Sequence, residues 1–179
     1  MTFPGVQIVK SSRYANLEQM PEWRDFKVMA TSASSDENYI SLTQRFMAFK
    51  DVMMDDEGGG AFIFKDDQNN GFISGVGVVT SSIYKTASVM TFWMEDADDF
   101  SLVIRAMIEF CEERGIESIN IELGMEKFFS VKSVQEVETV FVANDFKVLW
   151  KTHQKEDYPD NTFDTLECGL EYTSKNKII

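Results

Sequence analysis

The sequence predicts a mixed α/β domain, in which parallel and antiparallel strands share one central sheet and helices cover it. The first observation is the order of the expected elements, which runs strand, helix, helix, three strands, helix, strand, helix, strand, strand. The second is that this order joins a hairpin meander to a strand–helix–strand unit, so the sheet should be mixed. The third is length, because 179 residues suffice for one core and not for two comfortable ones. We therefore expect a single domain over residues 1–179, with its core between about Val6 and Tyr172.

The first third of the chain predicts one strand and two helices. Residues 6–9 form a short apolar run that is typical of a strand. A helical pattern starts near Pro21, and a second helix follows Ser34 and Glu37, whose spacing is that of a capping box. The second helix has the clearer pattern, because its apolar residues recur at alternating steps of three and four. These residues are Tyr39, Leu42, Phe46, Phe49 and Met53.

A hairpin and a third strand are expected next. Residues 61–64 and 72–79 are rich in strand-forming side chains, and turn-forming Asn and Gly residues lie between them. Gly75 and Gly77 in the second of these strands indicate a bulge or close packing. The third strand is expected at residues 87–94.

A long amphipathic helix is expected over residues 99–114. Gly115 ends it, because glycine readily adopts the left-handed conformation of a C-terminal cap. Residues 116–123 then alternate between apolar and polar side chains, which predicts a strand. The inner face of the helix is expected to consist of Phe100, Val103, Ile104, Met107, Ile108 and Cys111.

The last part of the chain predicts a helix and two strands. Ser133 and Glu136 have the spacing of a second capping box, which predicts a helix start, and Asn144 is the expected cap at the other end. Residues 146–150 and 163–172 supply the two last strands. The inner face of the helix is expected to be Val134, Val137, Val140 and Phe141.

Composition and charge exclude several classes of function. Hydrophobic residues make up 44% of the chain and charged residues 26%, which is typical of a globular protein and not of a disordered one. The formal net charge of −13 argues against nucleic acid as a ligand, because phosphate binding requires a basic surface. The same charge repels membranes and anionic cofactors, and it favours basic partners. Mimicry of nucleic acid by ordered carboxylates is a minor alternative.

The sequence contains no targeting signal that we recognise. No apolar run approaches the roughly 20 residues that a membrane-spanning helix needs, and the first residues lack the basic and apolar segments of a signal peptide. Cys111 and Cys168 lie in apolar periodic segments outside any CxxC pair, so we expect both to be reduced core residues. These features predict a cytoplasmic protein, and they are also compatible with a component of a virus particle.

Two stretches of the sequence resemble the GCN5-related N-acetyltransferase (GNAT) superfamily. Residues 106–116, AMIEFCEERGI, look like the long helix of that family running into its fifth strand. Residues 143–148, ANDFKV, look like the segment that leads into its sixth strand. The resemblance covers residues 6–172 and implies the GNAT element order β-α-α-β-β-β-α-β-α-β-β. It also implies acetyl-CoA as cofactor and N-acyl transfer as the reaction of an active member.

The resemblance also identifies the loop that holds the diphosphate of coenzyme A in the family. That loop carries Arg or Gln, two free positions, Gly, one free position, and Gly or Ala. A gapless alignment back from Arg114 puts residues 95–100, EDADDF, at this loop. Glu95 then stands where Arg or Gln is expected, Asp98 replaces the first glycine, and Phe100 replaces the second small residue.

These departures argue against binding of the cofactor. Two like charges about 5 Å apart repel each other by about 3 kcal/mol at an effective dielectric constant of 20. Residues 95–100 contain four carboxylates, so the summed repulsion would remove micromolar affinity for a diphosphate. We expect Asp98 and Asp99 to cap the start of the helix instead. A second departure is that Phe141 stands where many members of the family have a Tyr as general acid.

Other candidate chemistry in the sequence is weak. His153 is the one histidine of the chain, and without a second histidine or a thiolate cluster it predicts no transition-metal site. Residues 55–57 are acidic but lack the ligand spacing of an EF-hand, so we expect a solvated loop. Cys111 is expected to be inert, because apolar surroundings raise the pKa of a thiol. We expect no metal site in this protein.

Two functions from different classes are open. In the first, which we favour, the GNAT-like chain has lost acyl-CoA catalysis, holds no cofactor, and binds a protein partner, for example within a larger assembly. In the second, it is an active N-acetyltransferase with a non-standard acetyl-CoA loop, and its acidic surface suits a cationic amine. Self-association is compatible with either. The residues that would contact the cofactor in the second case are Phe92, Trp93, Met94, Asp99 and Phe100, and the candidate bases are Glu95 and Glu122.

Overall fold

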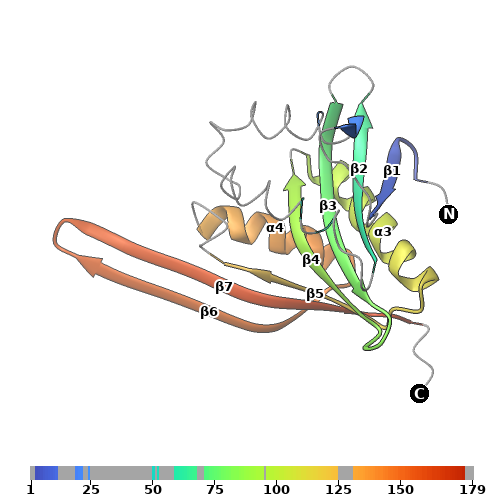
Figure 1. Ribbon diagram of the computed structural model, residues 1–179. Helices are drawn as coiled ribbons and strands as arrows, with labels where there is room; N and C mark the ends of the chain where they lie inside the picture. Colours follow the sequence, from blue (N-terminus) through green and yellow to red (C-terminus); the bar gives the residue numbers. More distant parts are fainter. Residues whose placement is uncertain are drawn as a thin grey trace.

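Seven strands of the computed structural model form one mixed sheet, in the order β1-β2-β3-β4-β5-β7-β6 (Figure 1). The structure describes residues 3–11, 19–21, 24, 50, 52, 59–67, 71–94, 96–124 and 131–175, and this number of strands refers to them. The strands are β1 (Val6–Lys10), β2 (Gly60–Asp67), β3 (Gly71–Ser81), β4 (Thr86–Met94), β5 (Ser118–Leu123), β6 (Lys147–Tyr158) and β7 (Asn161–Thr173). The long helices of the described part are α3 (Ala97–Glu113) and α4 (Val131–Ala143). The mixed sheet confirms the predicted fold class.

The sheet has two antiparallel parts that are joined by a short parallel contact. Strands β1 to β4 pair with one another in chain order, and β5, β7 and β6 form the second antiparallel group. Between the two parts, β4 and β5 pair in parallel over a short stretch that ends with Ser88 and Asn120. Beyond that pair β4 continues to Met94 and β5 to Leu123 in diverging directions (Figure 1). The two strands are therefore splayed at their C-terminal ends.

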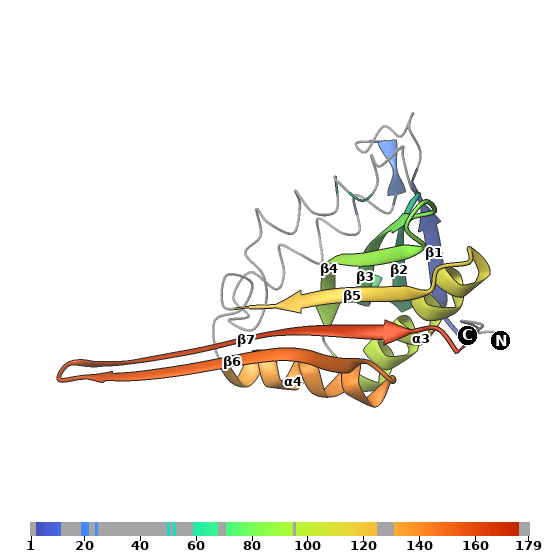
Figure 2. The same cartoon turned by 90° about the horizontal axis from the view of Figure 1, so that it is seen from below.

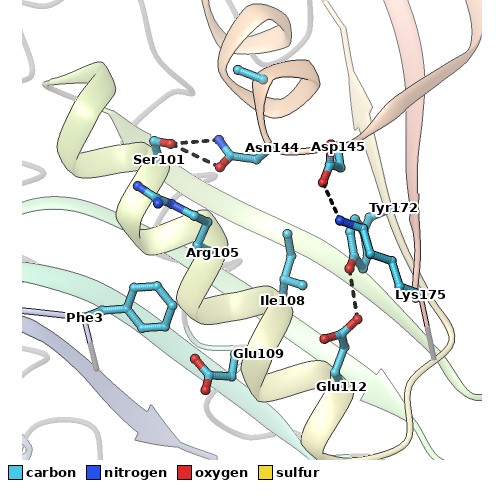
Figure 3. Close-up of a pocket in the computed structure, with 11 residues that line it drawn as sticks. Phe3, Ser101, Arg105, Ile108, Glu109, Glu112, Asn144, Asp145, Tyr172 and Lys175 are labelled. Carbon is cyan, nitrogen blue, oxygen red and sulfur yellow. Dashed lines mark hydrogen bonds and ion pairs between the residues drawn. The ribbon is translucent and has the colours of Figure 1, made fainter. Parts of the chain in front are cut away.

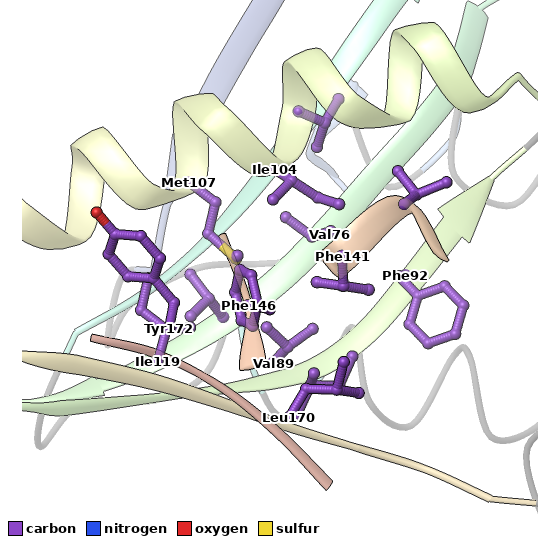
Figure 4. Packing of buried hydrophobic residues seen from close by; sticks show 14 of the residues in the cluster. Val76, Val89, Phe92, Ile104, Met107, Ile119, Phe141, Phe146, Leu170 and Tyr172 are labelled. Carbon is purple, nitrogen blue, oxygen red and sulfur yellow. The ribbon is translucent and has the colours of Figure 1, made fainter. Parts of the chain in front are cut away.

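Helices α3 and α4 cover one face of the sheet. Helix α3 packs against β2, β3 and β4, whereas α4 packs against β7. The core between helices and sheet contains a row of aromatic rings, of which several are labelled in Figure 4. The ring centroids of Phe100 and Phe141 lie 5.6 Å apart, and those of Phe141 and Phe146 lie 5.0 Å apart. At the two ends of the row, Phe92 contacts Phe100 and Tyr172 contacts Phe146.

The opposite face of β2 to β4 is also buried. Phe62, Phe64 and Trp93 lie there, each with at most 1% of its surface exposed. The two glycines of β3 belong to this packing, because a Cβ on Gly75 would come 2.9 Å from the ring of Phe62. At Gly77 the register with β4 shifts as well. The sequence predicts a bulge or close packing at these glycines, and the structure shows close packing at both and a register shift at Gly77.

The hairpin of β6 and β7 extends well beyond the rest of the sheet (Figures 1 and 2). Strand β5 ends at Leu123, which pairs with Cys168, so the part of β7 before Cys168 has only β6 as a neighbour among the described strands. We call this two-stranded part, Thr152–Glu167, the arm. All residues of β6 are exposed.

Several predicted boundaries were wrong, and the arm is the largest case. The sequence predicts strands at residues 146–150 and 163–172, whereas β6 reaches Tyr158 and β7 begins at Asn161. The missed residues are mostly polar and carry no apolar alternation. They are strands because each pairs with the other strand of the hairpin, up to the closing pair of Tyr158 and Asn161.

The predicted capping box at Ser133 was also wrong. Helix α4 already begins at Val131, so Ser133 lies inside the first turn and its side chain is buried. An N-cap residue must precede the helix, and Ser133 therefore cannot have that role. At the other end the prediction is confirmed, because Asn144 Nδ2 donates a hydrogen bond to the carbonyl oxygen of Val140 at 2.8 Å.

The structure also tests the predicted end of α3, but it does not test the two helices predicted near the start of the chain. Gly115 has a φ of +73° just after α3, which confirms the left-handed cap. The two helices expected between Pro21 and Met53 lie outside the described residues, apart from isolated positions. In the described part of the chain, no helix has the length and apolarity needed to cross a membrane.

Candidate functional site at the start of helix α3

The candidate site lies where β4 leaves the sheet and α3 begins. The register between β3 and β4 shifts because Gly77 pairs with Thr91 and Val78 pairs with Val89. Met90 is therefore an extra residue of β4, and this bulge lies just beyond the end of the parallel contact with β5. The bulge and the splay leave the β5-facing edge of β4 beyond Ser88 without a strand partner in the described part of the chain.

The N-terminus of α3 is occupied by a side chain of the protein itself. Asp96 is the N-cap residue, with extended backbone angles of φ −127° and ψ 133°. Its Oδ1 accepts hydrogen bonds from the backbone N–H groups of Asp98 at 2.9 Å and Asp99 at 3.0 Å. These are two of the free donors that make a helix start attractive to an anion. The carboxylate of Asp96 therefore fills the position at which an external anion would bind.

Asp98 and Asp99 have another role than the sequence predicts. We expected their carboxylates to cap the helix, but they lie in its first turn and supply the N–H groups that Asp96 caps. Their negative charges still complement the helix dipole. The capping prediction was thus wrong by a few residues, because the aspartate just before the helix has the extended backbone that a cap requires.

The aromatic residues of the candidate site belong to the core. Phe100 has no exposed surface and contacts the rings of Phe92 and Phe141. Trp93 and Met94 are also buried, at 1% and 9% exposure. None of these side chains is exposed enough to receive a ligand in this conformation, so only their backbone groups could take part in binding. Glu95 lies outside the described residues.

Phe141 occupies the centre of the core. Its ring has no exposed surface and makes edge contacts with Phe100 and Phe146. The side chain thus offers neither a hydroxyl group nor a path to solvent. At the position where the resemblance places a general acid, the chain has a packing residue.

Glu122 lies on the other face of the sheet from this core. It is exposed in β5, while its neighbours Ile121 and Leu123 are buried. Across the strands Glu122 pairs with Gly169, which in turn pairs with Trp150 of β6. The indole of Trp150 lies over Gly169, since a Cβ there would come 2.2 Å from its Nε1. The structure therefore brings Glu122 near an exposed indole and keeps it apart from the N-terminus of α3.

Comparison with solved structures gives agreement in overall fold at low sequence identity. A GCN5-related N-acetyltransferase from Kribbella flavida matches with a TM-score of 0.62 at 10% identity, over 95% of this chain and 98% of that one. This chain has the GNAT fold. An aminoglycoside 6′-N-acetyltransferase from Enterococcus faecium matches the GNAT fold of this chain with a TM-score of 0.59 at 9% identity, over 93% and 96% of the two chains. A ribosomal-protein-alanine N-acetyltransferase from Brucella melitensis matches with a TM-score of 0.57 at 8% identity, over 94% of this chain and 99% of that one.

Sequence comparison gives no match for this GNAT-fold chain. No protein-family model matches it, and no curated protein does. Identities of 8 to 10% to the three structures support the fold and nothing finer.

A second feature of the GNAT-fold domain is a cavity of about 690 Å³ along the outer side of α3 (Figure 3). A polar network borders it at the C-terminal end of the helix. Glu112 Oε1 accepts hydrogen bonds from the hydroxyl groups of Tyr172 at 2.9 Å and Ser174 at 2.8 Å. Lys175 forms an ion pair with Asp145 at 3.2 Å. This network ties the end of β7 to α3, and sequence reasoning missed it because its members are far apart in the chain.

The two cysteines are free core residues, as the sequence predicts. Both are free and buried without exposed surface. Burial raises the pKa of Cys111 to about 12 and that of Cys168 to about 11. A thiol with such a pKa is protonated at neutral pH and is a poor nucleophile.

Proposed function

We propose that this GNAT-fold chain has lost acyl-CoA-dependent catalysis and acts as a binding or structural component that recognises another protein chain. The observation that carries the proposal is the hydrogen bonding of Asp96 to the N–H groups of Asp98 and Asp99. In the family that the chain resembles, the start of this helix receives the diphosphate of coenzyme A. Here the carboxylate of Asp96 already accepts hydrogen bonds from these N–H groups, so coenzyme A would have to displace that carboxylate before it could bind.

Electrostatics supports the same conclusion. Displacing Asp96 would leave its carboxylate and those of Asp98 and Asp99 beside the incoming diphosphate. At about 5 Å each such pair costs about 3 kcal/mol at an effective dielectric constant of 20, so three pairs exceed the binding free energy of a micromolar ligand. The net charge of −13 adds long-range repulsion of the same sign.

The packing around the site supports the loss of catalysis as well. Phe100 takes the place of a small residue that lets the cofactor approach the backbone, and it is fully buried in the core. Phe141 takes the place of the general acid and is equally buried. Both phenylalanines therefore serve as core residues at positions where the family has functional ones.

A second candidate function is supported by the geometry of β4. The splay from β5 and the bulge at Met90 leave backbone groups of Phe92, Trp93 and Met94 on an edge that the family uses for the pantetheine arm. In this alternative the chain is an N-acetyltransferase that holds acetyl-CoA by a shifted path, with Glu95 or Glu122 as base. The acidic surface and the amine acceptors in the names of two similar structures favour a cationic amine as substrate.

An assay of thiol release from acetyl-CoA distinguishes the two functions. We expect no release of free coenzyme A above the buffer rate with spermidine, an aminoglycoside or a lysine-containing peptide as acceptor. Glu122→Gln serves as the matched variant, because removing a general base lowers a rate by about 10²–10⁴-fold. Thiol release by the natural sequence would refute the proposal, and a fall by such a factor in Glu95→Gln or in Glu122→Gln would establish the alternative and identify its base.

A further inference from the structure

The two faces of the β6–β7 hairpin are distinguished by the position of α4. Lys151 Nζ lies 2.9 Å from the carboxylate oxygens of Glu138 in α4, so Lys151 is on the face that carries this helix (Figure 2). Side chains alternate between the two faces of a strand, and the pairing from Trp150 to Tyr158 is regular. Trp150 and every second residue after it therefore point to the other side, together with their partners in β7. We call this side the open face, and its aromatic and acidic members are Trp150, Glu156, Tyr158, Phe163 and Glu167.

Charge is separated between the two faces. On the α4 side, acidic neighbours such as Glu138 and Asp164 balance the basic side chains of residues 150–158, which are Lys151, His153 and Lys155. The open face of the same stretch and of its partners, residues 161–169, carries Glu156 and Glu167 and no basic side chain. Both glutamates are exposed. The open face is therefore an acidic surface on a chain whose net charge is already −13.

The exposed aromatic side chains of the hairpin lie on the same open face. Trp150, Tyr158 and Phe163 are 43%, 59% and 57% exposed. Phe163 pairs directly with Glu156, and the Tyr158 hydroxyl donates a hydrogen bond to Glu156 Oε2 at 2.5 Å. Glu167 is a diagonal neighbour of Trp150, at a Cα separation of about 7–8 Å that long side chains bridge. Each end of the open face thus combines an aromatic ring with a carboxylate.

This combination is suited to cationic side chains. The face of an aromatic ring attracts a guanidinium or ammonium group within about 6 Å of its centroid, and arginine is found there more often than lysine. A carboxylate beside the ring adds an ion pair to the same cation. A second copy of this chain is a poor occupant, because it would bring the same carboxylates to the interface.

We propose that the open face binds an extended segment of another protein through two arginine or lysine side chains, one at Trp150 and one at Phe163. The proposal rests on the proposed function, because it supplies the surface by which the chain recognises its partner. Phe163 lies opposite Glu156, six residues along β6 from Trp150, which corresponds to about 20 Å. An extended segment covers this distance in six residues and points both side chains to the same side. Cationic residues at positions i and i+6 therefore fit the open face.

Two peptides of one composition and different spacing test the proposal. In the spaced peptide, acetyl-RSTSTSR-amide, the arginines are six residues apart, and in the control peptide, acetyl-STRRSTS-amide, they are adjacent. We expect the spaced peptide to bind at low salt with a dissociation constant of about 0.1–1 mM, roughly threefold to tenfold tighter than the control. The NMR signals of the Trp150 indole N–H and of the Phe163 amide are expected to shift on binding.

Glu156→Gln and Asp157→Asn form a matched pair of variants. Each removes one negative charge from the arm at adjacent positions, but only Glu156 lies on the open face. We expect Glu156→Gln to weaken binding of the spaced peptide by about threefold to fivefold, and Asp157→Asn by less than about twofold. Phe163→Thr removes an aromatic ring while keeping a good strand former, so we expect it to weaken binding by about threefold with the arm intact.

Several results would overturn the proposal. Equal weakening by Glu156→Gln and Asp157→Asn, or equal affinity for the two peptides, would reduce the binding to attraction by net charge. Absence of binding up to about 5 mM peptide, or shifts confined to residues outside the hairpin, would remove the site. A concentration-dependent dimer in sedimentation that Phe163→Thr abolishes would assign the open face to a second copy.

Failure of this proposal is distinguishable from failure of the proposed function. Binding of acetyl-CoA together with binding of the spaced peptide would refute only the loss of the cofactor. Absence of both kinds of binding would overturn only the assignment of the open face.

Discussion

Replacing Phe100 by alanine is expected to lower the free energy of unfolding by about 3–5 kcal/mol, the largest effect of any single change considered for this chain. The ring has no exposed surface and lies between Phe92 and Phe141, at centroid distances of 6.0 and 5.6 Å. Its removal leaves a cavity that neighbouring rigid rings fill poorly. Denaturant unfolding at constant pH measures the loss.

The control for Phe100→Ala is Ile83→Ala. Ile83 is 85% exposed, so its truncation is expected to change the free energy of unfolding by about 0.5 kcal/mol or less. A loss below about 1 kcal/mol for Phe100→Ala would contradict the core role of the ring. That result would also reopen the position for a ligand, because a small residue there would then be tolerated.

Replacing Glu112 by alanine is expected to lower the free energy of unfolding by about 2–4 kcal/mol. Its Oε1 accepts hydrogen bonds from Tyr172 and Ser174, whose side chains are only 6% exposed. Without the carboxylate, both hydroxyl groups lose a charged acceptor in a place that water reaches poorly. The control is Glu113→Ala, which removes the same charge at an exposed neighbouring position. Comparing the thermal unfolding of the two variants distinguishes loss of the hydrogen-bond network from a general effect of removing a charge. Equal stability of the two variants would contradict the role of Glu112.

The same network predicts a dependence of stability on alkaline pH. Burial, and then the hydrogen bond to Glu112, raise the pKa of Tyr172 from 10 to about 12. Because the folded state holds this proton more tightly than the unfolded state, its contribution is complete below pH 10 and is lost as the pH rises from 10 to 12. Cys111 and Cys168 act in the same direction from pH 9 upward. The contribution of Tyr172 is therefore the difference in the free energy of unfolding between the natural sequence and Tyr172→Phe. If this difference stayed constant as the pH rises above 10, the role of Tyr172 would be contradicted.

Much of the fold could be predicted from the sequence because its elements carry strong local patterns. The apolar face of α3 and its glycine stop, and the alternation of β5, are dictated by residues close in the chain. The arm escaped prediction because its strands contain few apolar residues and are stabilised by pairing with each other. The start of α4 escaped because a serine and a glutamate three residues apart can also occur inside a first turn.

The candidate site was harder to predict than the fold. Sequence alignment found the acidic character of residues 95–100, but several aspartates compete for the capping role, and only the backbone conformation selects Asp96. The network of Glu112, Tyr172 and Ser174 joins positions about sixty residues apart, which no local pattern reveals. Burial of Phe100 followed from the helical periodicity, whereas its contacts with Phe92 and Phe141 required the tertiary structure.

A calorimetric titration of the natural sequence with acetyl-CoA at low salt, with thermal unfolding in parallel, tests the central claim most directly. Because Asp96 occupies the N-terminus of α3, we predict no heat of binding and no rise of the melting temperature up to about 1 mM acetyl-CoA. Because low salt screens charges least, it expresses fully both the repulsion of the acidic loop and any attraction of the diphosphate to the start of the helix. A micromolar dissociation constant would stabilise the fold by about 2.7 kcal/mol at a hundredfold excess over that constant. Such binding, with the corresponding rise in melting temperature, would contradict the claim that this GNAT-fold domain has lost its cofactor.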